Sequence, residues 1–95
     1  MKTLKDLVEL YEGKRLWFYI PRKSKRVFYK EIKKMDIKFS MNKKISPFKI
    51  SDMMAISNGQ LSYISCACWI RSKLDKNIIK IDYKKYIDGE SYLID

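Results

Sequence analysis

The stretch RLWFYIPRKSKRVFYKEI, residues 15–32, is the part of the chain on which a fold prediction depends most. Residues 15–20 are rich in aromatic and apolar side chains and are followed by Pro21, which is typical of a β-strand. Residues 21–25 read as a cationic turn, after which residues 26–32 can return as a second strand. The stretch therefore predicts a β-hairpin.

Cross-strand pairing supports this hairpin, because aromatic pairs and an opposite-charge pair each stabilise neighbouring strands by about 0.2–1 kcal/mol. With a five-residue loop the predicted pairs are Phe18 with Phe28, Trp17 with Tyr29, and Arg15 with Glu31. One face, expected in the core, would carry Leu16, Phe18, Phe28 and Ile32, and the other Trp17, Tyr19 and Tyr29. Residues 27–36 also fit a helix, since Phe28, Ile32 and Met35 have helical spacing. We favour the hairpin over this alternative.

Positive charge is concentrated around the same stretch. Residues 14–49 hold thirteen cations and two acids, a net charge of +11, whereas residues 1–13 carry −1 and residues 50–95 are neutral. Cations interleaved with aromatic rings suit a surface that neutralises phosphates and stacks on bases. Lys greatly outnumbers Arg in the whole chain, which favours contact with the backbone over reading of bases.

We therefore predict a nucleic-acid-binding surface, DNA or RNA, within residues 14–49. Its candidate residues are Arg15, Trp17, Tyr19, Arg22, Lys23, Lys25, Arg26, Tyr29 and Lys30. Contact with about five phosphates would give a slope of about −4.5 for log K against log salt. We interpret the pairs Lys33-Lys34 and Lys43-Lys44 as solvated charge only.

The N-terminal segment predicts an amphipathic helix over residues 3–12, packed on the domain's own sheet. Leu4, Leu7, Val8 and Tyr11 recur at helical spacing. Thr3 is a candidate N-cap with Asp6 three residues later, and Gly13 stands where a helix-ending glycine belongs. A partner-binding helix is the alternative.

The middle of the chain predicts short elements. Residues 37–41 alternate as a strand, residues 42–47 connect, and residues 51–56 can form a short helix opened by Ser51. Asn58-Gly59 indicates a turn.

Residues 60–74 fit both periods and stay open between helix and strand. Residues 78–83 predict a strand. Asp88-Gly89 is typical of a hairpin turn, after which residues 91–94 would return.

Together these elements predict one α+β domain over residues 1–95, with an N-terminal helix, antiparallel β-hairpins and one or two further helices. As an alternative, residues 49–94 resemble a winged helix-turn-helix. Ala55 and Gly59 have that family's spacing, and residues 70–79 resemble its recognition-helix exit into the wing. The resemblance implies a DNA-reading helix at residues 61–74, although the charge lies elsewhere, in residues 14–49.

Composition argues against an enzyme. The chain has no histidine, which removes the commonest general base and metal ligand. Cys66 and Cys68 are too few for a structural zinc site, so we expect two small buried residues, no metal and no cofactor. Their spacing does not suit a disulfide, which favours a reducing, cytoplasmic setting. We expect no secretory signal and no membrane span.

Three functions from different classes remain. The first is a non-catalytic protein that binds nucleic acid or a nucleoprotein complex. The second is a small phage or mobile-element inhibitor, anti-CRISPR-like, that docks on a host protein with a nucleic-acid channel. The third is a histidine-free, ribosome-dependent endoribonuclease toxin, for which the candidate residues are Arg15, Tyr19, Arg22, Tyr29 and Lys30.

Overall fold

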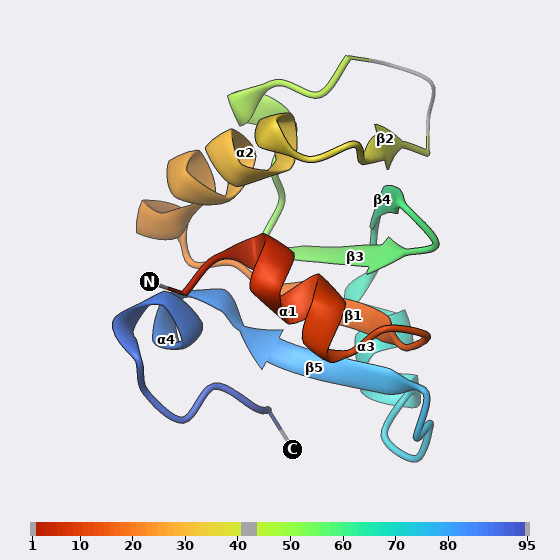
Figure 1. Cartoon of the computed structure of the whole chain (residues 1–95). Coiled ribbons are helices and arrows are strands. Elements are labelled where there is room, and N and C mark those ends of the chain that lie inside the picture. Colours follow the sequence, from red (N-terminus) through yellow and green to blue (C-terminus); the bar gives the residue numbers. More distant parts are fainter. Residues whose placement is uncertain (1, 41–43, 95) are drawn as a thin grey trace.

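A five-stranded mixed sheet forms the centre of the protein in a computed structural model, which describes residues 2–40 and 44–94 (Figure 1). The strands lie in the order β2-β4-β3-β1-β5. Their bounds are β1 Arg15–Tyr19, β2 Lys38–Phe39, β3 Met53–Ser57, β4 Gln60–Tyr63 and β5 Ile78–Asp82. The chain is thus a small α+β domain, as predicted.

Strand β1 lies between two strands that are distant in sequence. It pairs antiparallel with β3, with Phe18 opposite Met54, and parallel with β5, with Phe18 beside Ile81. Strands β3 and β4 form an antiparallel hairpin, and β2 adds to β4 in parallel. The expectation of antiparallel hairpins alone was therefore incomplete, because two of the four pairings are parallel.

Short helices surround the sheet. They are α1 Leu4–Leu10, α2 Lys25–Lys34, α3 Cys66–Arg71 and α4 Tyr83–Asp88, with 3₁₀ turns η1 Arg22–Ser24 and η2 Pro47–Lys49. Helices α1 and α2 cover one face of the sheet, called here the inner face, and α3 lies behind the opposite, outer face (Figure 1). This layering decides which side each functional side chain occupies.

The hydrophobic core lies between the inner face and helices α1, α2 and α4. Strands contribute alternate residues, and the buried side chains include Leu4, Leu7, Leu16, Phe18, Phe28, Ile32, Met54, Ile56, Leu61, Ile81 and Tyr83. Three aromatic rings meet edge-to-face at its centre. The ring of Phe28 lies 5.4 Å from that of Phe18 and 5.0 Å from that of Tyr83. The predicted core set Leu16, Phe18, Phe28 and Ile32 is confirmed.

Helix α1 forms as predicted, because its start is specified locally. The Thr3 hydroxyl accepts from the backbone N–H of Asp6, and the Asp6 carboxylate accepts from the backbone N–H of Thr3. This reciprocal capping box satisfies two N–H groups that have no partner within the helix. Gly13 has a φ of 84°, a left-handed conformation that suits glycine.

The predicted hairpin over residues 15–32 is wrong, because residues 25–34 form helix α2 rather than a returning strand. Phe18 and Phe28 do contact each other, but Phe28 lies on helix α2 and packs against Phe18 of strand β1. The Trp17–Tyr29 and Arg15–Glu31 pairs do not form, since β1 takes β3 and β5 as neighbours. The alternative prediction, a helix based on the spacing of Phe28, Ile32 and Met35, is correct.

The predicted short helix over residues 51–56 is also wrong, because β3 occupies residues 53–57. The Asn58-Gly59 turn is confirmed as the β3–β4 hairpin turn, and both residues have positive φ, 52° and 74°. Ala55 therefore lies in a strand rather than in the helix that the winged helix-turn-helix resemblance requires. That alternative fold is not confirmed.

Both periodicities of residues 60–74 have a counterpart in the structure. The segment begins as β4 and continues, from the N-cap Ser65, as α3. The predicted strand over residues 37–41 is seen as β2, Lys38–Phe39, whereas Met41 and the connecting residues 42–43 lie outside the described residues.

The C-terminal prediction is correct for β5 and wrong for the hairpin turn. Residues 83–88 form α4, and Gly89, with a φ of 78°, ends that helix. The chain nevertheless returns, since Leu93 makes an isolated antiparallel bridge with Ile81.

Candidate nucleic-acid interface

The nine predicted site residues do not form one surface. Arg15, Trp17 and Tyr19 alternate along β1 and face outward, on the side covered by α3. The other six follow on η1 and α2, which pack on the inner face: Arg22, Lys23, Lys25, Arg26, Tyr29 and Lys30. Trp17 and Tyr29, predicted as neighbours, therefore lie on opposite sides of the sheet.

On the outer face, Trp17 is partly covered by a residue that the sequence prediction missed. The rings of Trp17 and Trp69 lie 6.1 Å apart with an interplanar angle of 32°. Lys80 lies over the Trp69 ring, 5.1 Å from its centroid, and its Nζ donates to the Trp69 carbonyl at 2.8 Å. Trp17 thus holds α3 on the sheet, and of the predicted aromatics only Tyr19 remains well exposed.

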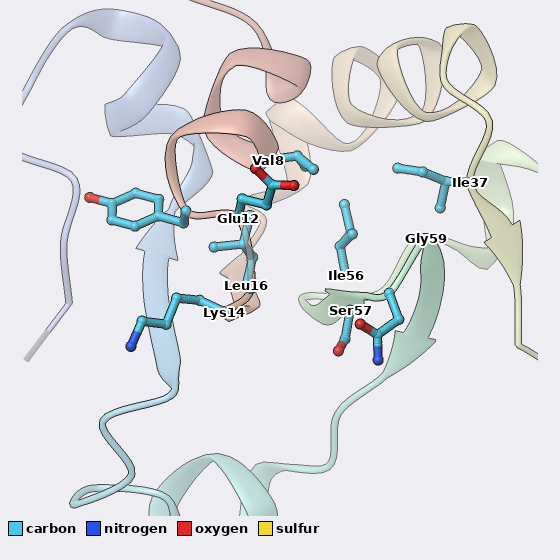
Figure 2. Close-up of a pocket in the computed structure, with 11 residues that line it drawn as sticks. Val8, Glu12, Lys14, Leu16, Ile37, Ile56, Ser57 and Gly59 are labelled. Atoms are coloured by element: carbon cyan, nitrogen blue, oxygen red, sulfur yellow. The ribbon is translucent and has the colours of Figure 1, made fainter.

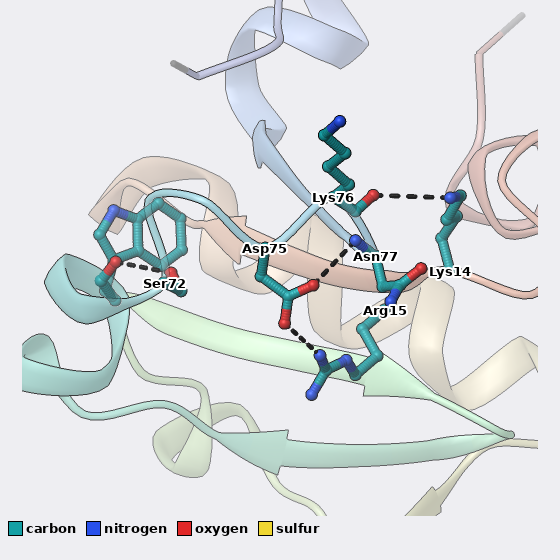
Figure 3. A network of polar contacts seen from close by, with 7 residues as sticks. Lys14, Arg15, Ser72, Asp75, Lys76 and Asn77 are labelled. Carbon is teal, nitrogen blue, oxygen red and sulfur yellow. Dashed lines mark hydrogen bonds and ion pairs between the residues drawn. The ribbon is translucent and has the colours of Figure 1, made fainter.

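Arg15 forms an ion pair with Asp75 in the loop before β5 (Figure 3). Its guanidinium contacts the Asp75 carboxylate at 2.6 Å, and the other carboxylate oxygen accepts from the backbone N–H of Asn77 at 2.9 Å. The neighbouring Lys14 donates to the Lys76 carbonyl at 3.5 Å. These contacts tie the start of β1 to the loop before β5 and leave Arg15 poorly placed to bind a phosphate.

A cationic surface lies on η1 and α2, and we name it the cationic ridge. It consists of the exposed side chains of Arg22, Lys23, Arg26, Lys30, Lys33 and Lys34. Arg26, Lys30 and Lys33 follow one helical face at i, i+4 and i+7. Within residues 2–40 and 44–94, no acidic side chain forms an ion pair with any of the six.

Two predicted residues of this segment have structural roles. Lys25 contacts Asp52 at 2.6 Å, which joins the start of α2 to the loop before β3. Tyr29 is half-buried against the core, and the Nζ of Lys33 lies 5.5 Å from its ring centroid. Lys33 and Lys34, set aside as solvated charge, belong to the ridge. The helical spacing of residues 27–36 was the signal that could have placed them there.

The only acid within η1 and α2, Glu31, points inward. Its carboxylate accepts a hydrogen bond from the backbone N–H of Leu4 at 2.6 Å and another from the hydroxyl of Tyr83. Burial, followed by this bond to Glu31, raises the pKa of Tyr83 above its usual value. The acid therefore joins α1 and α4 to α2 and, among the described residues, forms no ion pair with a cation of the ridge.

A cavity of about 280 Å³ lies between the end of α1 and the β3–β4 turn (Figure 2). Val8, Leu16 and Ile56 make its wall apolar, and Glu12 and Lys14 supply the charged groups. The ammonium of Lys14 points away from the cavity in Figure 2, toward the carbonyl of Lys76. The cavity thus combines one carboxylate with apolar walls, and we assign no chemistry to it.

The two cysteines lie on α3 and are exposed, which corrects the expectation that they are buried. Among the described residues no group of three or more His, Cys, Asp or Glu side chains is placed to hold a metal ion. Hydrogen bonding to Ser65 and the positive charge of Arg71 lower the pKa of the Cys68 thiol.

This environment predicts that Cys68 is the more reactive thiol. At pH 8 the Cys66→Ser variant, which keeps Cys68, should react faster with iodoacetamide than the Cys68→Ser variant. The comparison is made by mass spectrometry over time. Equal rates, or a faster Cys68→Ser variant, would contradict the prediction.

Comparisons with protein-family models, curated proteins and solved structures found no match to this chain. In the part of the chain that the structure describes, no helix has the length and apolar character needed to cross a membrane.

Proposed function

We propose that this protein binds nucleic acid without catalysis, through the cationic ridge of η1 and α2. The observation that carries the proposal is six exposed cations on one short segment whose single acid, Glu31, is turned into the protein. A helix surface with this charge attracts a polyanion and releases its condensed counterions. The proposal keeps the segment predicted from the sequence and changes the residues that act within it.

The dimensions of the ridge suit a phosphate backbone. From Arg22 to Lys34 the helical rise gives a length of about 18 Å, which is the axial length of about five nucleotides of one strand. Four of the six cations are lysines, which bind phosphates as point charges without bidentate geometry. The proposed binding is therefore tolerant of sequence and strongly dependent on salt.

The ridge also explains why the aromatic residues are not needed as base platforms. Tyr29 packs beneath the ridge and Trp17 is occupied by Trp69, so backbone contact is the main source of affinity. We place this binding in a reducing compartment such as the cytoplasm, a choice that the two exposed thiols of α3 support.

The test is binding of short single- and double-stranded DNA and RNA as salt is raised, by fluorescence anisotropy. With about five phosphates contacted, log K for duplex DNA should fall against log salt with a slope of about −4.5. The variant Lys23/Arg26/Lys33→Ala removes three ridge cations and should make that slope shallower by about 2.7. Alanine is a good helix former, so α2 should stay folded.

The matched control is Lys73/Lys76/Lys85→Ala, which removes the same charge from exposed lysines away from the ridge. It should keep the wild-type slope. Identical losses in both variants would show that net charge alone attracts the polymer, and absence of binding at physiological salt would reject the proposal.

A further inference from the structure

An open groove runs between the start of α1, the side of α2 and the end of α4. Its volume is about 620 Å³. The groove is lined by Lys2, Thr3, Lys5, Val27, Lys30, Glu31, Lys34, Met35 and Ile87. Only Lys30 and Lys34 are shared with the cationic ridge, so the groove is a distinct surface on the flank of α2.

The groove has an apolar floor and a basic rim. Val27, Met35 and Ile87 form the apolar part, and Val27 is 43% exposed although it lies on a helix that packs against the core. Lys2 lies just before α1 and Lys5 in its first turn, and Lys30 and Lys34 lie one turn apart on α2. The rim is therefore basic on both sides.

The acid inside the groove, Glu31, offsets only part of this charge, because four lysines line the groove against one carboxylate. Both oxygens of the Glu31 carboxylate are engaged by hydrogen bonds, one from the backbone N–H of Leu4 and one from the Tyr83 hydroxyl. The Lys2 ammonium lies 5.7 Å from the Tyr86 ring centroid, and the Tyr86 hydroxyl donates to the Thr3 carbonyl at 3.1 Å. These contacts hold the two residues before α1 against α4.

We propose that this groove binds an acidic amphipathic helix of a partner protein. Apolar side chains of that helix fill the floor over Val27, and carboxylates on either side of them pair with the lysines of both walls. A nucleic-acid backbone does not explain the groove, because phosphates gain nothing from the apolar floor. A fatty acid carries one charged group, which leaves most of the four rim lysines without a partner.

This inference goes beyond the proposed function, because the partner is a protein. Since Lys30 and Lys34 belong to both surfaces, the acidic helix and nucleic acid compete for them. An acidic partner would thereby release bound nucleic acid.

The probe is a fluorescein-labelled peptide of Glu, Leu and Ala, about 18 residues or five helical turns long, with leucines at i, i+3, i+4 and i+7. A second peptide of equal charge has serine in place of each leucine. The wild-type protein should bind the leucine peptide at least about tenfold more tightly than the serine peptide, by anisotropy at physiological salt.

Two pairs of variants locate the binding. Val27→Glu puts a carboxylate on the groove floor and should weaken binding of the leucine peptide at least about tenfold. The matched variant Leu74→Glu adds the same charge outside the groove, at a residue that is 93% exposed, and should not weaken binding. Lys2/Lys5→Ala should weaken binding of the peptide and leave binding of nucleic acid unchanged. Lys23/Arg26/Lys33→Ala should weaken binding of nucleic acid and leave binding of the peptide unchanged. Circular dichroism confirms that each variant is folded.

Equal binding of both peptides, or an unchanged affinity in Val27→Glu, would overturn the inference. Displacement of the peptide by micromolar decanoate would assign the groove to a fatty acid instead. Self-association that Val27→Glu abolishes would assign it to a second copy of the chain. Absence of nucleic-acid binding by the wild-type protein, together with intact peptide binding, would reject only the proposed function, so the two failures can be told apart.

Discussion

Replacing Phe28 by alanine should lower the free energy of unfolding by about 3–5 kcal/mol, the usual loss for a buried phenylalanine. The Phe28 side chain is fully buried and meets the rings of Phe18 and Tyr83 edge-to-face. Alanine favours the helix more than phenylalanine does, so the loss comes from the core and not from α2 itself. Since small domains are stable by about 5–15 kcal/mol, one substitution removes a large part of the total.

Urea denaturation monitored by circular dichroism measures this loss, and Phe48→Ala is the matched control. Phe48 is 97% exposed, so its removal should change the free energy of unfolding by less than about 0.5 kcal/mol. Similar losses in both variants would contradict the position of Phe28 at the centre of the core.

The second large effect is expected for Glu31→Ala, which should cost about 1.5–3 kcal/mol of stability. The substitution removes the carboxylate that accepts hydrogen bonds from the backbone N–H of Leu4 and from the hydroxyl of Tyr83. Because these two groups belong to α1 and α4, the variant loosens both helices from α2. Glu31→Gln keeps a side-chain oxygen that can accept a hydrogen bond, so it should lose less stability than Glu31→Ala.

The pH dependence of this loss separates the Tyr83 bond from a general packing effect. The pKa of Tyr83 is raised in the folded protein, so the stability it contributes is complete below pH 10 and is lost as pH rises above 10. Glu31→Ala removes one cause of that shift. Burial still raises the pKa of Tyr83 in Glu31→Ala, so both proteins lose stability equally just above pH 10. The difference in stability between wild type and Glu31→Ala should narrow only above the folded-state pKa of Tyr83 in the variant, as measured by urea titrations. Ionisation of Tyr83 at the same pH in both folded proteins would contradict this role of Glu31.

Other tyrosines titrate in the same range and are present in both proteins. A hydrogen bond to Tyr92 raises the pKa of Tyr11 to about 12, and burial raises that of Tyr86. The raised pKa of Tyr11 does not depend on Glu31 and lowers the stability of both proteins alike at high pH. The charge of Glu31 is the smallest cause of the raised pKa of Tyr86, so the comparison reports mainly on Tyr83.

Elements with local signals could be predicted from the sequence. The capping box of Thr3 and Asp6 specifies the start of α1, and Asn58-Gly59 specifies a turn through two positive φ angles. β1 and β5 are read from runs of aromatic and β-branched residues. In each case the signal is carried by residues that are close together in the sequence.

Elements that depend on distant partners could not be predicted in this way. Residues 26–32 can pair with β1 as a strand or form a helix, and both arrangements place Phe28 and Ile32 in the core. The helix forms because β3 and β5 already occupy the two edges of β1. Likewise, residues 53–57 become a strand through pairing with β1 and β4.

For the candidate site, the sequence by itself determined that the excess charge lies in residues 14–49 and that Arg22, Lys23, Arg26 and Lys30 belong to it. Only the tertiary structure decided that Arg15 and Trp17 are held by Asp75 and Trp69, that Glu31 accepts a hydrogen bond from Tyr83, and that Lys33 and Lys34 complete the ridge. Charge is a sum over residues and can be counted along the chain. Exposure and pairing depend on which distant segments pack together, and that depends on the sheet order.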